Sequence, residues 1–306
     1  MGTQALAEGS GISAGWFGRR GAEVWLLLGP CLFYLATFAI FPLVYSLRLS
    51  FTDLTAAVGT GRWVGLKNYS DLLVDPQFWN ATKNSLIMVA AAVTIQVVLG
   101  VALAMFFNLQ LRGSSIVRGI LALPMLITPI VVGVMWRALL NPDWGLINWA
   151  IAQVGFEPPN WLGSVEMAMK TLVLVDVWQW TPFVVIIVYA RLQALPHDVF
   201  EAAQIDGAGR ISTFRHITLP LLMPAILFAG IFRAVDEFRS FDLIYGLTYG
   251  GPARTTTTLS FFSFQNGFQF HNYGYAAAVA YVMLLILVAG TAILLRYVQL
   301  RPGHTQ

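Results

Sequence analysis

The sequence predicts an all-α integral membrane protein with six transmembrane helices, and both its composition and its apolar pattern lead to this fold class. Only 11% of the 306 residues are charged, 57% are hydrophobic, and the mean hydropathy is +0.69. A soluble domain carries about 25% charged residues, so this chain has too few to cover a surface that faces water. Six apolar stretches each approach the length of about 20 residues that a bilayer core requires. Because backbone groups find no water in hydrocarbon, we expect each stretch to be a helix.

The six predicted spans follow one another along nearly the whole chain. The first lies between Glu23 and Arg48. It is too long for the apolar core of a signal peptide, and no small-residue cleavage site follows it, so we expect it to be retained. The spans cover approximately residues 24–47, 85–109, 119–140 and 171–190, a fifth stretch that begins near Leu219, and residues 275–295.

Basic residues predict that both termini lie in the cytoplasm. Cytoplasmic loops of membrane proteins carry an excess of Lys and Arg. Short segments that hold Arg112, Arg191 and Arg215 lie on one side, whereas the basic residues of the other side are spread over longer loops. The first side is the better cytoplasmic candidate, and six spans return both ends of the chain to it. We therefore expect a disordered cytoplasmic tail at residues 1–23, a membrane domain at 24–296 with a cytoplasmic loop at 191–220, and a second tail at 297–306.

One cytoplasmic segment, EAAQIDGAGRISTFRHITLP at residues 201–220, is unusually polar for this chain. Pro196 can start a short helix that runs into this segment, and Gly207 with Gly209 can end that helix in a tight turn. The small residues that would let its backbone approach another surface closely are Ala202, Ala203 and Ala208. We interpret the segment as a docking helix for a soluble partner, with an ordinary connector as the alternative.

Two stripes of polar or aromatic residues lie within the fourth and fifth spans. Each has the spacing i, i+3, i+4, i+7, which places its members on one helical face. Ionisable residues inside a membrane usually face the protein interior or a water-filled cavity, so the two stripes could line one cavity. The alternative is internal ion pairing of Arg233 with Asp236 or Glu237, and of Arg239 with Asp242. The stripes are Asp176, Gln179, Trp180 and Phe183 in the fourth span, and Arg233, Asp236, Glu237 and Ser240 in the fifth.

Several kinds of chemistry are excluded. The lysines occur as LKN, TKN and MKT, so the chain lacks the phosphate-binding loop that an ATPase requires. It has no nucleophile elbow and no intramembrane HExxH. We expect no metal site, because the four histidines lack metal-ligand spacing, and no nucleic-acid partner, because there is no basic patch. If the protein uses ATP to move a solute uphill, another subunit must hydrolyse it.

The polar segment closely resembles the EAA loop of binding-protein-dependent ABC importer permeases. The positions that match are Glu201, Ala202, Ala203, Asp206, Gly207, Ala208, Ile217, Leu219 and Pro220. The stretches FPLVYSLRLSFTD, VGLKNYSDLLVDPQFWNATKNS, VWQWTPF and FDLIYGLTYGGP resemble the carbohydrate-importing branch, the maltose and glycerol-phosphate type of permease. The resemblance extends over about residues 25–295 and implies the six-helix, MetI-like fold of type I importers.

The resemblance also implies the partners of the chain. Such a permease lies in the cytoplasmic membrane of a bacterium or archaeon and pairs with a second, homologous permease subunit. Two ATP-binding cassette subunits dock below, and an extracytoplasmic binding protein delivers the solute. The chain itself would be no enzyme and bind no cofactor, because ATP and Mg are used by the partner ATPase. The EAA helix would couple to that ATPase through Glu201, Ala202, Ala203, Asp206, Gly207 and Ala208.

The resemblance places the solute path on the two polar stripes and implies a sugar, oligosaccharide or polyol. Carboxylates and guanidinium groups bind hydroxyls, and a flat aromatic ring covers the apolar face of a sugar. Glycerol 3-phosphate remains an alternative that the acidic excess of the stripes disfavours. Two rival functions are a secondary transporter, for which no internal repeat is found, and an intramembrane enzyme with Asp176, Asp236 and Glu237 as a catalytic cluster. The outer loops, 48–84, 141–170 and 243–274, would receive the binding protein or anchor the chain at the membrane interface.

Overall fold

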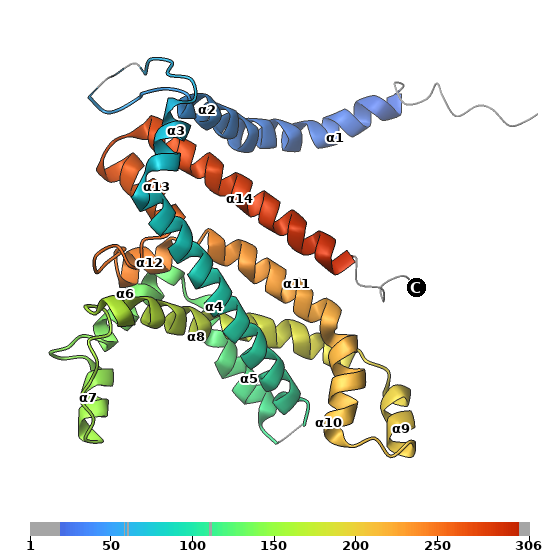
Figure 1. Ribbon diagram of the computed structural model, residues 1–306. Coiled ribbons are helices and arrows are strands. Elements are labelled where there is room, and N and C mark those ends of the chain that lie inside the picture. The colour runs from blue at the N-terminus through green and yellow to red at the C-terminus, as the bar shows by residue number, and fades with distance from the viewer. Residues whose placement is uncertain (1–18, 58, 60, 110–111, 300–306) are drawn as a thin grey trace, which may run out of the picture.

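The computed structural model describes residues 19–57, 59, 61–109 and 112–299, and these residues form helices joined by loops without any strand (Figure 1). Most of the predicted tails, 1–23 and 297–306, lies outside the described residues, although α1 already begins at Arg19 and α14 runs to Gln299. The all-α fold class is confirmed. Five of the six predicted spans are helices long and apolar enough to cross a membrane.

These five spans agree closely with the apolar runs of the sequence, but two of them contain a short π-helical turn. The first is α1 (Arg19–Leu35), η1 (Ala36–Ile40) and α2 (Phe41–Ser50). The fifth is α10 (Arg210–Thr213), η3 (Phe214–Thr218) and α11 (Leu219–Phe238). The second, fourth and sixth are α4 (Pro76–Phe107), α8 (Val165–Gln193) and α14 (Tyr273–Gln299).

The third span is broken where we predicted one helix over 119–140. It consists of α5 (Ser114–Ala122), η2 (Leu123–Leu126) and α6 (Pro129–Leu139), with a bend of 99° between its two parts. Proline disfavours a helical conformation in the residue before it, and Thr128 is extended ahead of Pro129. The break leaves the carbonyl of Ile127 without a helical partner, and the side-chain amide of Gln179 donates to it at 2.9 Å. Counted as one span, this pair completes the predicted set of six.

Short helices connect the spans at both ends of the molecule. Figure 1 places α3, α12 and α13 toward one end and α9, α10 and the loop before α5 at the other. The EAA segment lies at the second end. The short helices are α3 (Lys67–Val74), α7 (Leu146–Gln153), α9 (His197–Ile205), α12 (Asp242–Leu247) and α13 (Leu259–Phe264), the last followed by the π turn η4 (Gln265–Gln269).

The first span stands apart from the other helices. None of the residues in its most apolar stretch, within Trp25–Ser50, is buried. Its α2 end packs beside α14, where the hydroxyl of Tyr281 bonds to the carbonyl of Leu43, while α1 extends away from the bundle (Figure 1). The first span therefore has most of its surface available to lipid or to another chain.

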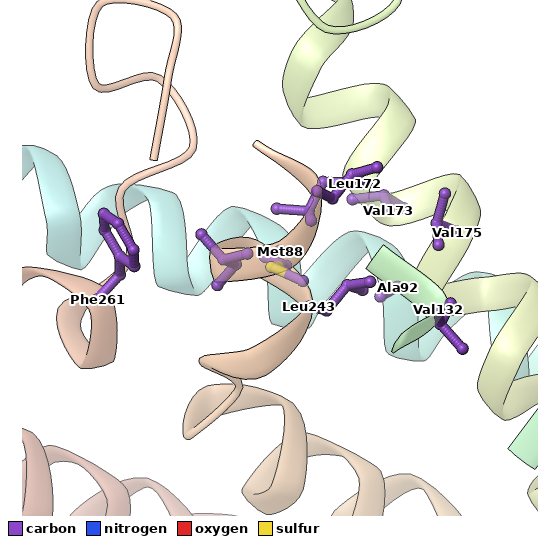
Figure 2. Packing of buried hydrophobic residues seen from close by; sticks show 10 residues of the cluster. Met88, Ala92, Val132, Leu172, Val173, Val175, Leu243 and Phe261 are labelled. Atoms are coloured by element: carbon purple, nitrogen blue, oxygen red, sulfur yellow. The ribbon is translucent and has the colours of Figure 1, made fainter. Parts of the chain in front are cut away.

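One of the buried hydrophobic clusters lies where α4, α8, α6 and α12 meet. Figure 2 shows Met88 and Ala92 of α4 beside Leu172 and Val175 of α8, with Leu243 of α12 packed against them. Lipid is as apolar as these side chains, so close packing rather than water exclusion holds membrane helices together. Small residues at the crossings are therefore important for stability.

The crossing of α6 and α12 depends on two glycines. A Cβ added at Gly246 would lie 2.7 Å from the carbonyl oxygen of Ile130, and one at Gly133 would lie 2.9 Å from the backbone nitrogen of Leu247. Backbone atoms cannot move aside as a flexible side chain does. This close approach joins α6, the second half of the third span, to α12, which begins shortly after the fifth span ends at Phe238.

Replacing Gly246 with alanine should destabilise the protein, because the new methyl group meets backbone that cannot yield. Overpacking of this kind costs about 1–3 kcal/mol. The measurement is the thermal unfolding midpoint of the purified protein in detergent. Gly290→Ala is the matched control, since a Cβ added there, also within a helix, meets nothing within 4 Å. Equal midpoints for the two variants would contradict the proposed crossing.

Candidate functional site

A buried arginine lies at the centre of the candidate site. Arg233 of α11 has 1% of its side chain exposed. Its Nη1 donates to Asp236 Oδ2 at 2.6 Å and its Nη2 to Glu237 Oε2 at 2.7 Å, both within the next turn of the same helix. Nη2 also donates to Asp176 Oδ2 of α8 at 3.2 Å. The internal ion pairing that we considered as the alternative for Arg233 is thus confirmed, and it extends to a second helix.

A third helix joins this network through Gln96 of α4. Its side-chain nitrogen donates to Asp176 Oδ2 at 2.6 Å, and its side-chain oxygen accepts from Arg233 Nε at 3.0 Å. Gln96 is fully buried. We did not identify it from the sequence, although a lone amide in the middle of the apolar run VTIQVV was a signal that it needs a polar partner within the membrane. We refer to Gln96, Asp176, Arg233, Asp236 and Glu237 as the Arg233 network.

An aromatic ring covers one face of the arginine. The guanidinium carbon of Arg233 lies 4.7 Å from the ring centre of Trp180, which is within the range of a cation–π contact. Trp180 comes one turn after Asp176 on α8, so the predicted helical face is correct for these two residues. Trp178, two residues before Trp180, lies edge-on against Trp136 of α6, with the ring centres 5.4 Å apart.

The Arg233 network borders a cavity of about 340 Å³. This volume lies in the range of small-molecule sites, which are about 300–1,000 Å³. Five of the eight residues that we placed on the solute path line it: Asp176, Trp180, Asp236, Glu237 and Ser240. The remaining wall consists of Pro129, which follows the break of the third span, and of Arg239, Phe241, Asp242 and Leu243 at the junction of α11 and α12.

The other three residues of the predicted path lie away from the cavity wall. Arg233 is buried, and its carboxylate partners Asp176, Asp236 and Glu237 lie between it and the cavity. Gln179 points to the break in the third span, where it bonds to Ile127. The ring of Phe183 stacks on Phe232 of α11, with the two centres 5.0 Å apart. Contact of any of the eight residues with a solute stays a prediction, but only five of them are in position to make it within this cavity.

The second ion pair of the alternative, Arg239 with Asp242, is not formed among the described residues. Arg239 instead lies 3.5 Å from Asp236. This part of the alternative is wrong because α11 ends at Phe238, so Arg239 and Asp242 do not share one continuous helix. Asp236 therefore lies between two arginines, and its side chain remains 36% exposed toward the cavity.

The EAA segment forms the predicted helix at the opposite end of the molecule. Helix α9 begins directly after Pro196 and ends in a turn at Gly207, whose φ of +74° suits glycine. The backbone nitrogen of Ala208 closes that turn with a 2.9 Å bond to the carbonyl of Ala203. Gly209 does not belong to this turn, since it begins the next helix, α10.

Most side chains that the resemblance assigns to coupling are free at the surface of this chain. Glu201, Ala202 and Asp206 are exposed, whereas Ala203 is buried and Ala208 is half-buried. Two apolar side chains that we did not single out flank them: Ile205 is 86% and Ile211 is 83% exposed. They lie on either side of the turn at Gly207. An exposed apolar pair beside a carboxylate is a surface that suits a protein partner.

Comparison with known proteins places the chain among membrane components of transport systems. Residues 96–301 match the family described as the inner membrane component of binding-protein-dependent transport systems. The trehalose/maltose transport system permease protein MalF of Thermococcus litoralis is 34% identical over 89% of this chain and 92% of its own length. The sulfoquinovosyl glycerol transport system permease protein SmoG of Agrobacterium fabrum is 32% identical over 90% of this chain and 89% of its own length.

A solved structure shares the fold over nearly the whole chain. The crystal structure of a bacterial ABC transporter that imports the acidic polysaccharide alginate contains a chain with a TM-score of 0.82 to this one. The match covers 93% of this chain and 98% of the other, at 21% sequence identity. The predicted fold of an importer permease is therefore confirmed across the six spans.

Replacing Arg233 with glutamine should destabilise the protein strongly, because the buried carboxylates of Asp176 and Glu237 would then remain without their cation. Removal of one partner from a buried ion pair costs about 3–5 kcal/mol. The control is Arg239→Gln, an exposed member of the same cluster, which should cost at most about 1 kcal/mol. Thermal unfolding of the purified variants measures both. A loss for Arg233→Gln no larger than that of the control would mean that the network does not hold the three helices together.

Proposed function

The chain belongs to the family of inner membrane components of binding-protein-dependent transport systems, and on this premise we propose that it is a permease subunit of an ATP-driven sugar importer. Its solute would be a sugar, an oligosaccharide or a polyol. The observation that carries the proposal is the cavity beside the Arg233 network, a polar and aromatic site within a membrane protein. The solute class has further support from the relatives named above, whose names refer to trehalose, maltose and sulfoquinovosyl glycerol.

The cavity wall has groups that suit a sugar. The carboxylate of Asp236 and the hydroxyl of Ser240 can bond to hydroxyl groups, and the ring of Trp180 offers a flat apolar surface. The cavity wall and the Arg233 network together contain four carboxylates but only two guanidinium groups, those of Arg233 and Arg239. The acidic residues are Asp176, Asp236, Glu237 and Asp242. This balance favours a neutral solute over glycerol 3-phosphate, which remains the second candidate.

Coupling to an ATPase would occur through α9. Helix α9 has an exposed carboxylate at Glu201 and an exposed apolar side chain at Ile205, and Ile211 of α10 is exposed beside it. This short helical segment has the size and character to fit a cleft in a soluble protein. The ATPase would bind and hydrolyse ATP with Mg, since this chain has no phosphate-binding loop. Figure 1 shows α9 on the same side as the start of α1 and the end of α14, which supports cytoplasmic termini on the side of the ATPase.

A second, homologous permease subunit would complete the path. The first span of this chain has no buried residue in its most apolar stretch, which supports an assembly in which another membrane subunit lies alongside. The cavity, lined here by residues of α6, α8, α11 and α12 and of the α11–α12 junction, would then receive its remaining wall from that subunit. A secondary transporter is the remote alternative, and uptake that survives ATP depletion would favour it.

Reversing the charge at Glu201 should abolish uptake, because Glu201→Lys would place a cation where the proposed ATPase contact needs a carboxylate. Solute uptake by proteoliposomes that contain the complete importer measures the effect. Insertion of the variant into the membrane should be normal, since Glu201 is exposed and makes no contact that holds this chain together. Gly207→Val should reduce uptake as well, because a β-branched residue is strained at a φ of +74°.

The matched control for Glu201 is Glu166→Lys, a charge reversal at an exposed residue in the first turn of α8, far from α9 along that helix. It should leave uptake unchanged. Wild-type uptake by Glu201→Lys would refute the coupling role of α9, whereas loss of uptake in both variants would show that charge reversal acts through a general effect on the protein.

Replacing Trp180 with leucine should lower uptake about tenfold, which corresponds to a loss of about 1.4 kcal/mol of stabilisation of the transported solute. Stimulation of ATP hydrolysis by the binding protein should persist, since α9 is unchanged. Trp178→Leu is the control, because that ring packs against Trp136 and is not part of the cavity wall. The solute is first identified by calorimetry of the cognate binding protein with a sugar panel. Equal uptake by both tryptophan variants would argue against solute binding in this cavity.

A further inference from the structure

The loop between α6 and α8 is a folded unit with a polar centre. Asn148 of α7 is buried, and its side-chain nitrogen donates to the carbonyls of Leu140 at 3.3 Å and Asn141 at 3.0 Å. Its side-chain oxygen accepts from the indole nitrogen of Trp161 at 2.7 Å. One side chain thus connects the end of α6, the helix α7 and the segment that leads into α8. We refer to residues 141–164 as the α7 loop.

Further bonds fix the ends of the α7 loop. The side-chain oxygen of Asn141 accepts from the backbone nitrogens of Asp143 at 2.9 Å and Trp144 at 3.3 Å. That of Asn160 accepts from the backbone nitrogen of Gly163 at 2.8 Å. Gly145 has no room for a side chain, because an added Cβ would lie 2.5 Å from the carbonyl oxygen of Asn141. These contacts hold the loop in one conformation, so the groups on its outside have defined positions.

The outside of the α7 loop is apolar, which is the reverse of a loop in water. Trp144 is 68% and Phe156 is 70% exposed, and Leu146, Trp149 and Val154 are exposed to a similar degree. The only charged residues among 141–164 are Asp143 and Glu157, and there is no Lys or Arg. Large aromatic rings beside few charges are the composition that gathers at the boundary between lipid and water.

The position of the α7 loop agrees with this boundary. Helix α6 ends at Leu139 and α8 begins at Val165, so the loop joins two membrane spans on the side away from α9. Figure 1 shows α7 at that end of α8 and running across its direction, as a helix does when it lies along a membrane surface. The apolar exterior also continues onto exposed residues of the neighbouring spans, among them Val134 and Val165.

We propose that the α7 loop is an interfacial anchor, with Trp144, Trp149 and Phe156 inserted among the lipid headgroups of the outer leaflet. Such an anchor would fix the depth of α6. Helix α6 crosses α12 at Gly133 and Gly246, and α12 contributes Asp242 and Leu243 to the cavity wall. The anchor would therefore also fix the position of that part of the wall. The other occupant of this surface would be the binding protein, but continuity with lipid-facing residues and the lack of charge favour lipid.

Site-directed spin labelling of the complete importer in lipid nanodiscs tests the anchor. Cys31 is the only cysteine of the chain, so Cys31→Ser provides the background for Trp149→Cys and Phe156→Cys. The measured quantity is the ratio of each label's collision rate with oxygen to its collision rate with an aqueous nickel reagent. This ratio should be several-fold higher at positions 149 and 156 than for Arg62→Cys, an exposed position of another outer loop. Interfacial helices bury their apolar face about 5–10 Å into the headgroup and acyl boundary, and the labels should report that depth.

Two results would overturn the anchor. One is aqueous accessibility at positions 149 and 156 equal to that at 62. The other is aqueous accessibility that disappears only after the binding protein is added, since this would make the α7 loop a docking surface for that protein. Both substituted residues are exposed and take no part in the bonds of Asn148, so the labelled chains should fold. The assay measures no transport, and its outcome is therefore independent of the proposed solute.

Discussion

The structure depends on how one guanidinium group is satisfied inside a membrane. An arginine at the centre of a membrane helix costs about 2.5–3.5 kcal/mol on insertion scales, and more when it has no partner. Arg233 has partners for its Nε and for both of its Nη atoms, and these partners come from α4, α8 and α11. Satisfying the arginine therefore brings the second, fourth and fifth spans together at one depth. The cavity forms beside this junction.

The same residues hold the helices together and form part of the proposed binding wall. Arg233 itself is buried, so a solute would meet the sides of the network that remain open. The most open side is Asp236, whose side chain is 36% exposed, whereas Oε1 of Glu237 is buried and has no hydrogen-bond partner among the described residues. Selectivity would then come mostly from groups at the rim, such as Ser240 and Arg239. Substitutions at the rim can change the solute without removing the bonds that hold the spans.

The sequence predicted side-chain positions and helix bounds well where they depend on one helix alone, and poorly where they depend on contacts between two helices. Periodicity placed Asp176 and Trp180 correctly on one face of α8, but Gln179 is on the side that meets the broken third span. Gln96 was missed because it belongs to a helix with no polar stripe of its own. The break before Pro129 was missed because apolar residues continue through it. The EAA helix was predicted well, since Pro196 and Gly207 mark its ends through their own backbone preferences.

The detached first span has a consequence for biogenesis. Helices of a membrane protein enter the bilayer in the order of synthesis and associate afterwards. The first span packs chiefly against α14, which is made last, and most of its surface meets no other part of the described chain. The first span therefore stays in the lipid without its α14 contacts until α14 has been made, and it has few other neighbours within the described part of the chain. In the proposed assembly with a second subunit, a copy without that subunit would keep this helix loosely attached, and the cellular amount of the protein would then follow the supply of the proposed partner.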